Sequence, residues 1–316
     1  MTVLVFGKNG LAGSAIVRKF AASNYEFIAL SRQDIDLSDF NKTLACIKDI
    51  KPSAVIVAAA RVGGMVANKN YPVEFLMDNL IIQNNVLKAS HLASIDRLVF
   101  LGSSCIYPAN AINPISEESL LTGKLEKTNE PYAIAKIAGL KLIQAFRTEY
   151  GRDWISVMPT NLYGPGDNFD LNNSHVLAAL IRKFHEATES KKESITLWGS
   201  GNPRREFLHV DDFAEAIKFC LENYHDGLPI NIGTGKDISI KELAELIAAQ
   251  VGFSGEIRWD TTVPDGIFQK RLDTTKINNL GWTPNIDLST GIPETIKWFQ
   301  AHLNDARLNV KVDLVS

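Results

Sequence analysis

Residues 2–16, TVLVFGKNGLAGSAI, join a short apolar run to a helical pattern through a glycine-rich turn. The run TVLVF is typical of a buried parallel strand, and apolar residues then recur at helical spacing as far as Phe20. Between them, Gly7, Gly10 and Gly13 follow the spacing GxxGxxG. In this context the glycines permit a tight turn, close approach of the backbone to a pyrophosphate, and close packing of helix on strand. The stretch predicts a nucleotide-binding unit, with a ligand-free glycine turn as the alternative.

The first half of the chain repeats this alternation of strand and helix. Strands are predicted at 27–30, 54–60, 98–101 and 155–158, and helices at 44–50, 75–89 and 132–146. Strands that alternate with helices indicate the α/β class and a doubly wound parallel sheet of the Rossmann type. Right-handed crossovers then restrict its topology.

Beyond Pro159 the rhythm loosens, and a smaller mixed α/β substrate lobe is expected at the C-terminal end. A loop is predicted over 161–173, helices at 175–187, 211–221 and 239–251, and strands at 195–198 and 230–232. Ser239 and Glu242 form a capping-box pattern. We expect a nucleotide-binding domain over 1–165 to which 211–240 returns, a substrate lobe from 166–210 and 241–303, and a tail over 304–316.

Composition and charge exclude several classes of protein. The 33 basic and 36 acidic residues leave a net charge of −3, which argues against a broad nucleic-acid-binding face. The three cysteines show no CxxC or Cys/His ligand spacing, so neither a disulfide framework nor a metal site is expected, and a cytoplasmic location fits. The N-terminus has no signal-peptide pattern, and no apolar run is long enough to span a bilayer.

The end of the second predicted strand bears on the choice of cofactor. Proteins that bind NAD place Asp or Glu there to hydrogen-bond the ribose 2′-hydroxyl. This chain has Ser31 and Arg32 instead. A guanidinium offers a fork of donors to a 2′-phosphate. The sequence therefore predicts NADP rather than NAD, with a solvated surface arginine as the alternative.

A tyrosine and a lysine lie four residues apart in PYAIAK, at the start of a predicted helix. This spacing places Tyr132 and Lys136 on one helical face. A nearby ammonium favours tyrosinate and lowers the tyrosine pKa, and such a tyrosine can exchange a proton with a sugar oxygen during hydride transfer. Alone, the pair is common by chance and is more often a helix-start tyrosine with a solvated lysine.

Together with the glycine loop and a serine after the fourth strand, this pair resembles the extended short-chain dehydrogenase/reductase superfamily. The resemblance implies that Ser103 hydrogen-bonds the substrate carbonyl, that Tyr132 is the general acid or base, and that Lys136 tunes it and holds the nicotinamide ribose.

Longer segments are similar to the GDP-L-fucose synthase family, from about Val3 to about Phe299. They are AAARVGGMVANKNYP (58–72), LGSSCIYP (101–108), NEPYAIAKIAGLKL (129–142), MPTNLYGPGDNF (158–169), SHV (174–176), WGSGNPRREFLHVDD (198–212) and INIGTG (230–235). The family epimerises carbons 3 and 5 of GDP-4-keto-6-deoxy-D-mannose and reduces its carbon 4 ketone with NADPH. The resemblance therefore implies an enzyme that joins isomerase and oxidoreductase chemistry in nucleotide-sugar biosynthesis.

Epimerisation needs a base on one face of the sugar and an acid on the other. The resemblance implies Cys105 as the base and His175 as the acid. A thiolate can act so only if its pKa is held near neutrality, whereas a histidine ordinarily titrates there. Ser103 and Tyr132 could supply donors to the enolate oxygen. Without the resemblance, the cysteine would be taken as a small buried residue and the histidine as a helix cap.

The resemblance also implies binding residues and a homodimer formed by the two long helices of the first domain. Substrate contacts fall on Lys183, Trp198, Arg205 and Asp265; lysine at 183 replaces a frequent arginine and loses bidentate geometry. Lys8-Asn9 also departs from the family, which leaves more of the NADP selectivity to Arg32. Cofactor contacts fall on Gly7, Lys8, Asn9, Gly10, Leu11, Ala12, Gly13, Arg32, Asp36, Leu37, Leu101, Gly102, Ser103, Ser104, Lys136, Pro159, Thr160, Asn161, Leu162 and His175.

Two other functions compete with this one. The first alternative is another nucleotide-sugar 4-epimerase, dehydratase or reductase. A dehydratase would show Thr-Asp-Glu where this chain has Ser103-Ser104-Cys105, and a 4-epimerase has no need of Cys105 or His175. A non-catalytic NADP-binding regulator would be expected to lose the Tyr132/Lys136 pair, which is present here.

Overall fold

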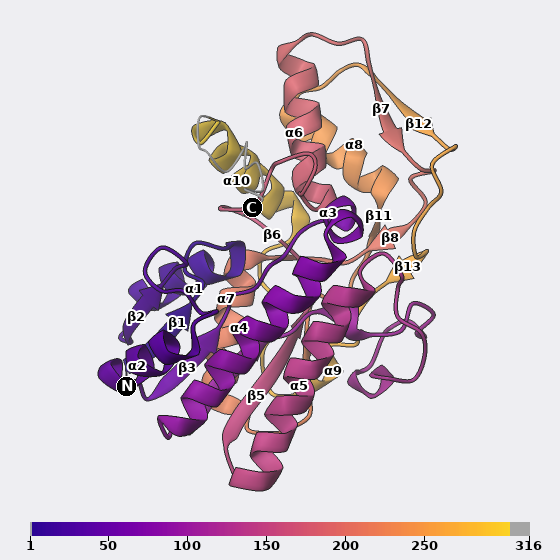
Figure 1. The fold of residues 1–316 in the computed structure, drawn as a ribbon. Helices are drawn as coiled ribbons and strands as arrows, with labels where there is room; N and C mark the ends of the chain where they lie inside the picture. The colour runs from indigo at the N-terminus through magenta and orange to yellow at the C-terminus, as the bar shows by residue number, and fades with distance from the viewer. Residues whose placement is uncertain (1, 304–316) are drawn as a thin grey trace.

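A six-stranded parallel sheet forms the centre of the computed structural model, which describes residues 2–303 (Figure 1). The strand order is β10-β5-β4-β3-β1-β2. The strands are β1 (Thr2–Phe6), β2 (Glu26–Leu30), β3 (Ala54–Val57), β4 (Arg97–Leu101), β5 (Asp153–Pro159) and β10 (Ile230–Ile232). Strand order reverses between β1 and β3, and ligands of such sheets bind at the carboxyl ends beside that point.

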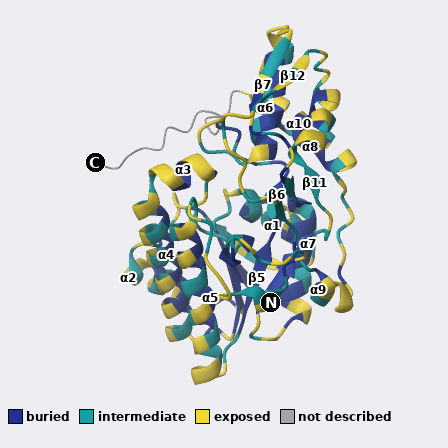
Figure 2. Ribbon diagram, turned by 90° about the vertical axis from the view of Figure 1, so that its right-hand side faces the viewer, coloured by how far each residue is buried: buried dark blue, intermediate teal, exposed yellow. Residues whose placement is uncertain are grey.

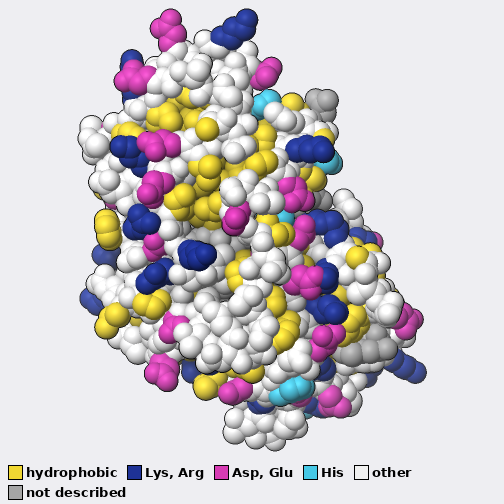
Figure 3. Space-filling view, turned by 180° about the vertical axis from the view of Figure 1, so that it is seen from behind, with side chains coloured by type: hydrophobic (Ala, Val, Ile, Leu, Met, Phe, Trp, Pro, Cys, Tyr) yellow, Lys and Arg dark blue, Asp and Glu magenta, His cyan; other side chains and the backbone are white. Residues whose placement is uncertain are grey.

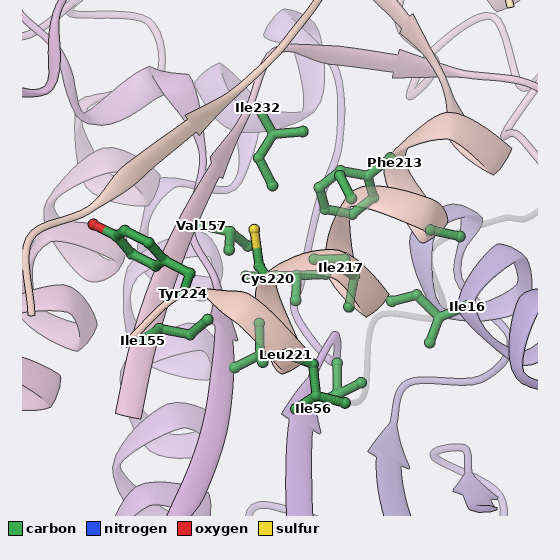
Figure 4. Packing of buried hydrophobic residues seen from close by; sticks show 14 of the residues in the cluster. Ile16, Ile56, Ile155, Val157, Phe213, Ile217, Cys220, Leu221, Tyr224 and Ile232 are labelled. Atoms are coloured by element: carbon green, nitrogen blue, oxygen red, sulfur yellow. The ribbon is translucent and has the colours of Figure 1, made fainter. Parts of the chain in front are cut away.

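Helices cover both faces of the sheet, because each strand sends alternate apolar side chains to opposite sides. α1 (Leu11–Ala21) and α7 (Val210–Asn223) lie on one face. α2 (Phe40–Ile50), α4 (Pro72–Leu92) and α5 (Glu130–Tyr150) lie on the other. In Figure 4, Val157 of β5 lies beside Cys220 of α7 and Ile56 of β3 beside Leu221, and all four belong to one buried cluster. The predicted parallel α/β class is confirmed.

A smaller lobe has its own apolar core between α6 (Val176–Glu189), α8 (Ile240–Val251) and α10 (Leu288–Ala301). Its short strands form pairs or triplets: β7 (Ser194–Trp198) with β12 (Glu256–Asp260), β8 (Arg204–Arg205) with β11 (Ile238–Ser239) and β13 (Gln269–Lys270), and β6 (Asn161–Tyr163) with β9 (Phe207–His209). The remaining helices are α3 (Met65–Asn70), α9 (Thr275–Asn279) and the 3-10 turns η1 (Ser104–Ile106) and η2 (Glu117–Ser119). The predicted division of the chain into domains stays a proposal, and its tail, residues 304–316, lies outside the described residues.

Several predicted boundaries change. The strand predicted at 54–60 ends at Val57, and the segment predicted as a loop from Asn161 begins with β6, which pairs with β9. The capping box of Ser239 and Glu242 is confirmed. α7 begins at Val210 rather than at Asp211, and its N-cap is His209, whose side chain accepts the Asp211 N–H. β6 has only three residues, which is too short to show the alternation of apolar and polar residues by which a strand is recognised from sequence.

The surface carries charges of both signs. Figure 3 shows basic and acidic side chains interspersed on one face, without a broad basic area. Figure 2 shows the sheet buried and the outer faces of α4 and α5 exposed. Within residues 2–303, no helix is both long and apolar enough to cross a bilayer. Cys46, Cys105 and Cys220 are all free thiols.

Candidate active site

The predicted site residues of the sheet domain lie at the carboxyl edge of the sheet. β1 leads into the glycine loop, β4 into η1, and β5 into the segment that reaches the small lobe. The loop after β2 and the starts of α1, α5 and α6 supply the remaining residues. This edge is where an open α/β sheet binds its ligands.

The glycine loop fits a dinucleotide pyrophosphate. Gly7 has φ +99°, and a Cβ there would lie 2.6 Å from the backbone nitrogen of Ala59. A Cβ on Gly13 would lie 2.0 Å from the Gly7 oxygen, so the strand and the helix can pack this closely only with glycine. Gly10 caps α1 without a side-chain bond, and the first turn of α1 contains no acidic residue. The amides of Leu11, Ala12 and Gly13 are therefore available to an anion.

The loop after β2 contains a preformed ion pair beside Arg32. Lys8 Nζ lies 2.8 Å from Asp34 Oδ2, and the same carboxylate accepts the amide and hydroxyl of Ser31. These bonds, the one from Lys8 foremost, hold the Asp34 pKa well below its usual range. Lys8 is already paired with Asp34. Arg32 is exposed and has no hydrogen-bond or ion-pair partner among residues 2–303, so it is the cation at this strand end that can receive a ligand.

Two further residues predicted to contact the cofactor follow in the same loop. Asp36 accepts the amide and hydroxyl of Ser38, and Leu37 is buried in the core on the α4 side of the sheet.

Ser103, Cys105 and Tyr132 come together where β4 ends. Ser103 is extended, and its hydroxyl accepts the Cys105 N–H at 3.2 Å. The chain then turns into η1, so the side-chain direction of Cys105 is set by a 3-10 turn and not by a continued strand. Tyr132 shares a hydrogen bond with Ser103 and lies close enough to Cys105 to feel its charge. One phenol therefore faces both the hydroxyl and the thiol.

The expectation that Lys136 lowers the Tyr132 pKa is not met in this structure. Burial raises the Tyr132 pKa well above its ordinary value, a Cys105 thiolate would raise it further, and the Ser103 bond opposes the rise. Lys136 Nζ donates to the Leu101 oxygen at 2.8 Å and lies 5.8 Å from the centroid of the Tyr132 ring. Burial lowers the Lys136 pKa to about 8. Tyr132 is thus a protonated phenol near neutrality.

Packing between α4 and α5 fixes the position of Tyr132. Gln83 of α4 donates to the Ala135 oxygen at 2.7 Å. A Cβ on Gly139 would lie 2.6 Å from the Phe100 ring, so α5 rests directly on β4. Phe75 meets Tyr132 edge to face, with centroids 6.3 Å apart. These contacts bring α5 onto the end of β4.

Asn129 is a site neighbour that the sequence did not single out. Its Nδ2 lies 3.3 Å from the Cys105 sulfur. It caps α5 by position, but its side chain makes no capping bond. The only sequence signal is its place three residues before Tyr132.

His175 is not hydrogen-bonded to the cluster of Ser103, Cys105 and Tyr132 among the described residues. It is the N-cap residue of α6. The preceding loop is held to the sheet domain by the Gly64 N–H, which donates to the Asn173 oxygen at 2.8 Å. Desolvation lowers the His175 pKa below its ordinary value.

The segment after β5 is tied to a buried glutamate that sequence reasoning missed. Glu206 accepts the amides of Thr234, Gly235 and Leu272 at 2.6 to 2.8 Å. Its backbone oxygen accepts bonds from the side chains of Thr160 and Asn161, two predicted cofactor contacts. Glu206 thereby joins the end of β5 to the strand of Arg205. The available signal in the sequence was an acidic residue placed between Arg205 and the apolar pair Phe207-Leu208.

The predicted substrate residues lie in the small lobe. Lys183 Nζ is 5.1 Å from the centroid of the Trp198 ring, which is 64% exposed. Arg205 donates to the Arg204 oxygen, and Glu126 and Asp265 lie near its charge. Asp265 accepts the amide and hydroxyl of Ser200. Desolvation lowers the pKa of both Lys183 and Arg205.

One group among the described residues has ligand atoms close enough for a metal ion: His209, Asp211 and Glu294. His209 Nδ1 accepts the Asp211 N–H at 3.3 Å, so the neutral ring carries its proton on Nε2. That nitrogen lies 3.8 Å from a Glu294 oxygen. Nε2 would have to give up its proton before it could bind a metal.

The comparisons with known proteins agree with this geometry. The family model described as "NAD dependent epimerase/dehydratase family" matches residues 3–233. The chain is 49% identical to "GDP-L-fucose synthase 1" of Arabidopsis thaliana over 94% of this chain and 92% of that one. It is 46% identical to "GDP-L-fucose synthase" of Escherichia coli K12 over 94% and 96% of the two chains.

Solved structures are similar over almost the whole chain. A GDP-L-fucose synthetase from Naegleria fowleri bound to NADP superposes with a TM-score of 0.89 and 30% identity, covering 97% of this chain and 94% of that one. MlghC, a GDP-mannoheptose C4 reductase from Campylobacter jejuni with NADP bound, superposes with a TM-score of 0.85 and 35% identity, covering 95% of this chain and 98% of that one. The chain belongs to the NAD dependent epimerase/dehydratase family and, within it, to the group of the GDP-L-fucose synthases.

Proposed function

We propose that this chain converts GDP-4-keto-6-deoxy-D-mannose to GDP-L-fucose by epimerisation at carbons 3 and 5 and NADPH-dependent reduction at carbon 4. The observation that carries the proposal is the gathering of Ser103, Cys105 and Tyr132 at one sheet edge. A plain ketoreductase needs only the hydroxyl, the phenol and the lysine. A thiol beside them adds a group that can take a proton from carbon.

In the epimerisation, a Cys105 thiolate takes the proton alpha to the ketone, and His175 returns one from the opposite face. Ser103 and Tyr132 hydrogen-bond the carbon 4 oxygen and stabilise the enolate. A lowered His175 pKa makes its imidazolium a stronger acid, although a smaller fraction is protonated at neutral pH.

In the reduction, Tyr132 gives its proton to the carbon 4 oxygen, and its raised pKa keeps that proton in place until charge develops there. NADPH, when bound, supplies the hydride. Lys136 is held by the Leu101 oxygen at the base of this site and would hold the nicotinamide ribose.

Binding is divided between the two parts of the molecule. The amides at the start of α1 would hold the cofactor pyrophosphate, and Arg32 its 2′-phosphate. Lys183, Trp198, Arg205 and Asp265 would hold the GDP end, with Arg205 at the diphosphate. NADP in two solved relatives supports the choice of cofactor.

The test is NADPH oxidation with GDP-4-keto-6-deoxy-D-mannose in deuterated water. We expect NADPH consumption together with deuterium at carbons 3 and 5 of the product. Consumption without deuterium would make the chain a carbon 4 reductase, and no consumption by the intact protein would contradict the proposal.

We also propose a homodimer in the cytoplasm, where Cys105 would stay reduced. Val73, Met77 and Ile81 lie four residues apart on α4 and are 61%, 53% and 38% exposed. Ile134 of α5 is 44% exposed. Such an apolar stripe is what a helix-pairing interface requires. Sedimentation of a Met77→Lys variant tests it: the dimer should dissociate, and an unchanged sedimentation coefficient would contradict the proposal.

A further inference from the structure

Cys105 must be a thiolate to take a proton from carbon, yet its surroundings offer little to stabilise the negative charge. The thiol packs against a buried cluster made of Ala67 from α3, Phe75 from α4 and Tyr132 from α5. Tyr132 is kept protonated, and a thiolate beside it raises its pKa further. The Lys136 ammonium behind Tyr132 is bonded to the Leu101 oxygen. No lysine, arginine or histidine among the described residues is bonded to the sulfur.

One polar group does reach the sulfur. Asn129 Nδ2 lies 3.3 Å from Cys105 Sγ, within the range of an N–H···S hydrogen bond. Its Oδ1 is buried and has no hydrogen-bond partner among the described residues. The side-chain nitrogen of Asn129 thus bonds the sulfur, whereas its oxygen is free to accept a hydrogen bond.

The position of Asn129 at the start of α5 would suggest a helix cap, but the geometry does not support that role. Its side chain accepts no amide of the first turn. Its φ and ψ of −130° and 15° also differ from the extended backbone usual at an N-cap. A buried amide oxygen left without a donor carries a free-energy cost. The Asn129 side chain therefore bonds the sulfur instead of capping the helix, even though its oxygen is left unpaired.

We propose that Asn129 is the positioning residue that stabilises the Cys105 thiolate, by donating its amide N–H to the sulfur, and that its free oxygen accepts a hydroxyl of the bound sugar. The thiolate form accepts this bond more strongly than the thiol, so the bond favours loss of the thiol proton. The part that concerns the sugar rests on the function proposed above; the part that concerns the thiol does not.

The test reads the thiol directly. Alkylation of Cys105 by iodoacetamide is followed against pH, with the Cys105 peptide quantified by mass spectrometry in wild type, Asn129→Ala and Asn129→Asp. Loss of one bond to a charged acceptor should raise the midpoint by about one pH unit. Asn129→Asp keeps the shape but replaces the donor by a carboxylate, so its midpoint should rise at least as far.

Thr128→Ala is the matched control, because the Thr128 hydroxyl bonds Glu126 in the same loop and not the sulfur. Its midpoint should equal that of the wild type, and thermal melts show whether each variant is folded. Unchanged midpoints in both Asn129 variants would overturn the proposal. An equal shift in Thr128→Ala would also overturn it, since loop displacement would then be the cause.

The same variants separate this inference from the proposed function. Deuterium uptake at carbons 3 and 5 should require higher pH in Asn129→Ala, with a shift that matches the alkylation midpoint. If the wild type does not turn over the GDP-sugar but the midpoints shift, the proposed function fails and the thiolate contact stands. If turnover is normal and the midpoints do not move, only this inference fails.

Discussion

The reaction edge of the sheet domain and the GDP-binding face of the small lobe are built differently. At the sheet edge, Tyr132 and Lys136 are 8% and 3% exposed, and each has a defined partner. In the small lobe, the Trp198 side chain is 64% exposed, and the Lys183 ammonium lies 5.1 Å from the centroid of its ring. Proton transfer needs atoms held within a fraction of an ångström, whereas recognition of a flexible diphosphate tolerates mobile groups. Substitutions at the sheet edge should therefore change rates, and those in the lobe should change affinity.

The largest effect is expected for Cys105→Ser. A hydroxyl at this site cannot reach the anionic form near neutrality, so deuterium uptake at carbons 3 and 5 should fall by about 10³-fold or more. Cys46→Ser is the control and should match the wild type. Uptake at the wild-type rate in Cys105→Ser would exclude the thiol as the base.

Tyr132→Phe should slow NADPH oxidation by about 10²- to 10³-fold, because the proton donor to the carbon 4 oxygen is removed. Ser103 would still bind that oxygen, so deuterium uptake should fall less than oxidation does. Equal losses in both assays would mean that Tyr132 mainly shapes the site.

Arg205→Ala tests the other side of the comparison. Loss of a charge-assisted contact to the diphosphate should raise KM by about 10- to 100-fold with kcat nearly unchanged. Arg204→Ala is the matched control, because Arg204 is already paired with Asp237 at 2.7 Å and should affect folding stability rather than KM. A fall in kcat at constant KM would contradict the assignment.

Asp167, in the loop that joins the two regions, gives a pH effect on stability. Burial raises its pKa to about 7, and its Oδ2 has no partner among the described residues. Because the folded-state pKa lies above the unfolded one, the protonated group contributes stability at low pH that is lost as pH rises through 7. Between pH 6 and 8 the wild type should lose about 1 kcal/mol, or about 2–4 °C in Tm. The Tm of Asp167→Asn should not show this fall with pH. Parallel pH profiles of Tm for the wild type and Asp167→Asn would refute the assignment to Asp167.

The smallest effect is expected for Trp198→Ala. The exposed cation–π contact with Lys183 contributes about 0.5–1 kcal/mol, so KM should rise only about two- to fivefold. Trp198→Phe should recover most of it. A loss as large as that of Arg205→Ala would show that Trp198 stacks on the guanine.

Much of the fold could be predicted, since the strands of the sheet domain are continuous apolar runs and its helices have clear periodicity. Gly7, Gly10 and Gly13 lie in the turn expected of them, and NADP is bound by solved relatives. The catalytic roles of Ser103, Cys105, Tyr132, Lys136 and His175 stay predictions. In the small lobe, the strand predicted at 195–198 is confirmed as β7, and its partner β12 was missed. The remaining strands there have two or three residues, which is too few to show a periodicity.

The linear order of residues was enough to establish the parallel α/β class, the cofactor loop and the family, because these depend on local spacing and long motifs. Tertiary packing alone determined what surrounds each reactive group. Burial keeps Tyr132 protonated and lowers the Lys136 pKa, which reverses the expectation from their spacing. The bond from Asn129 to Cys105 joins residues 24 positions apart. Desolvation and hydrogen bonding depend on contacts between segments that are distant in sequence, and the residue spacing within one segment does not reveal those contacts.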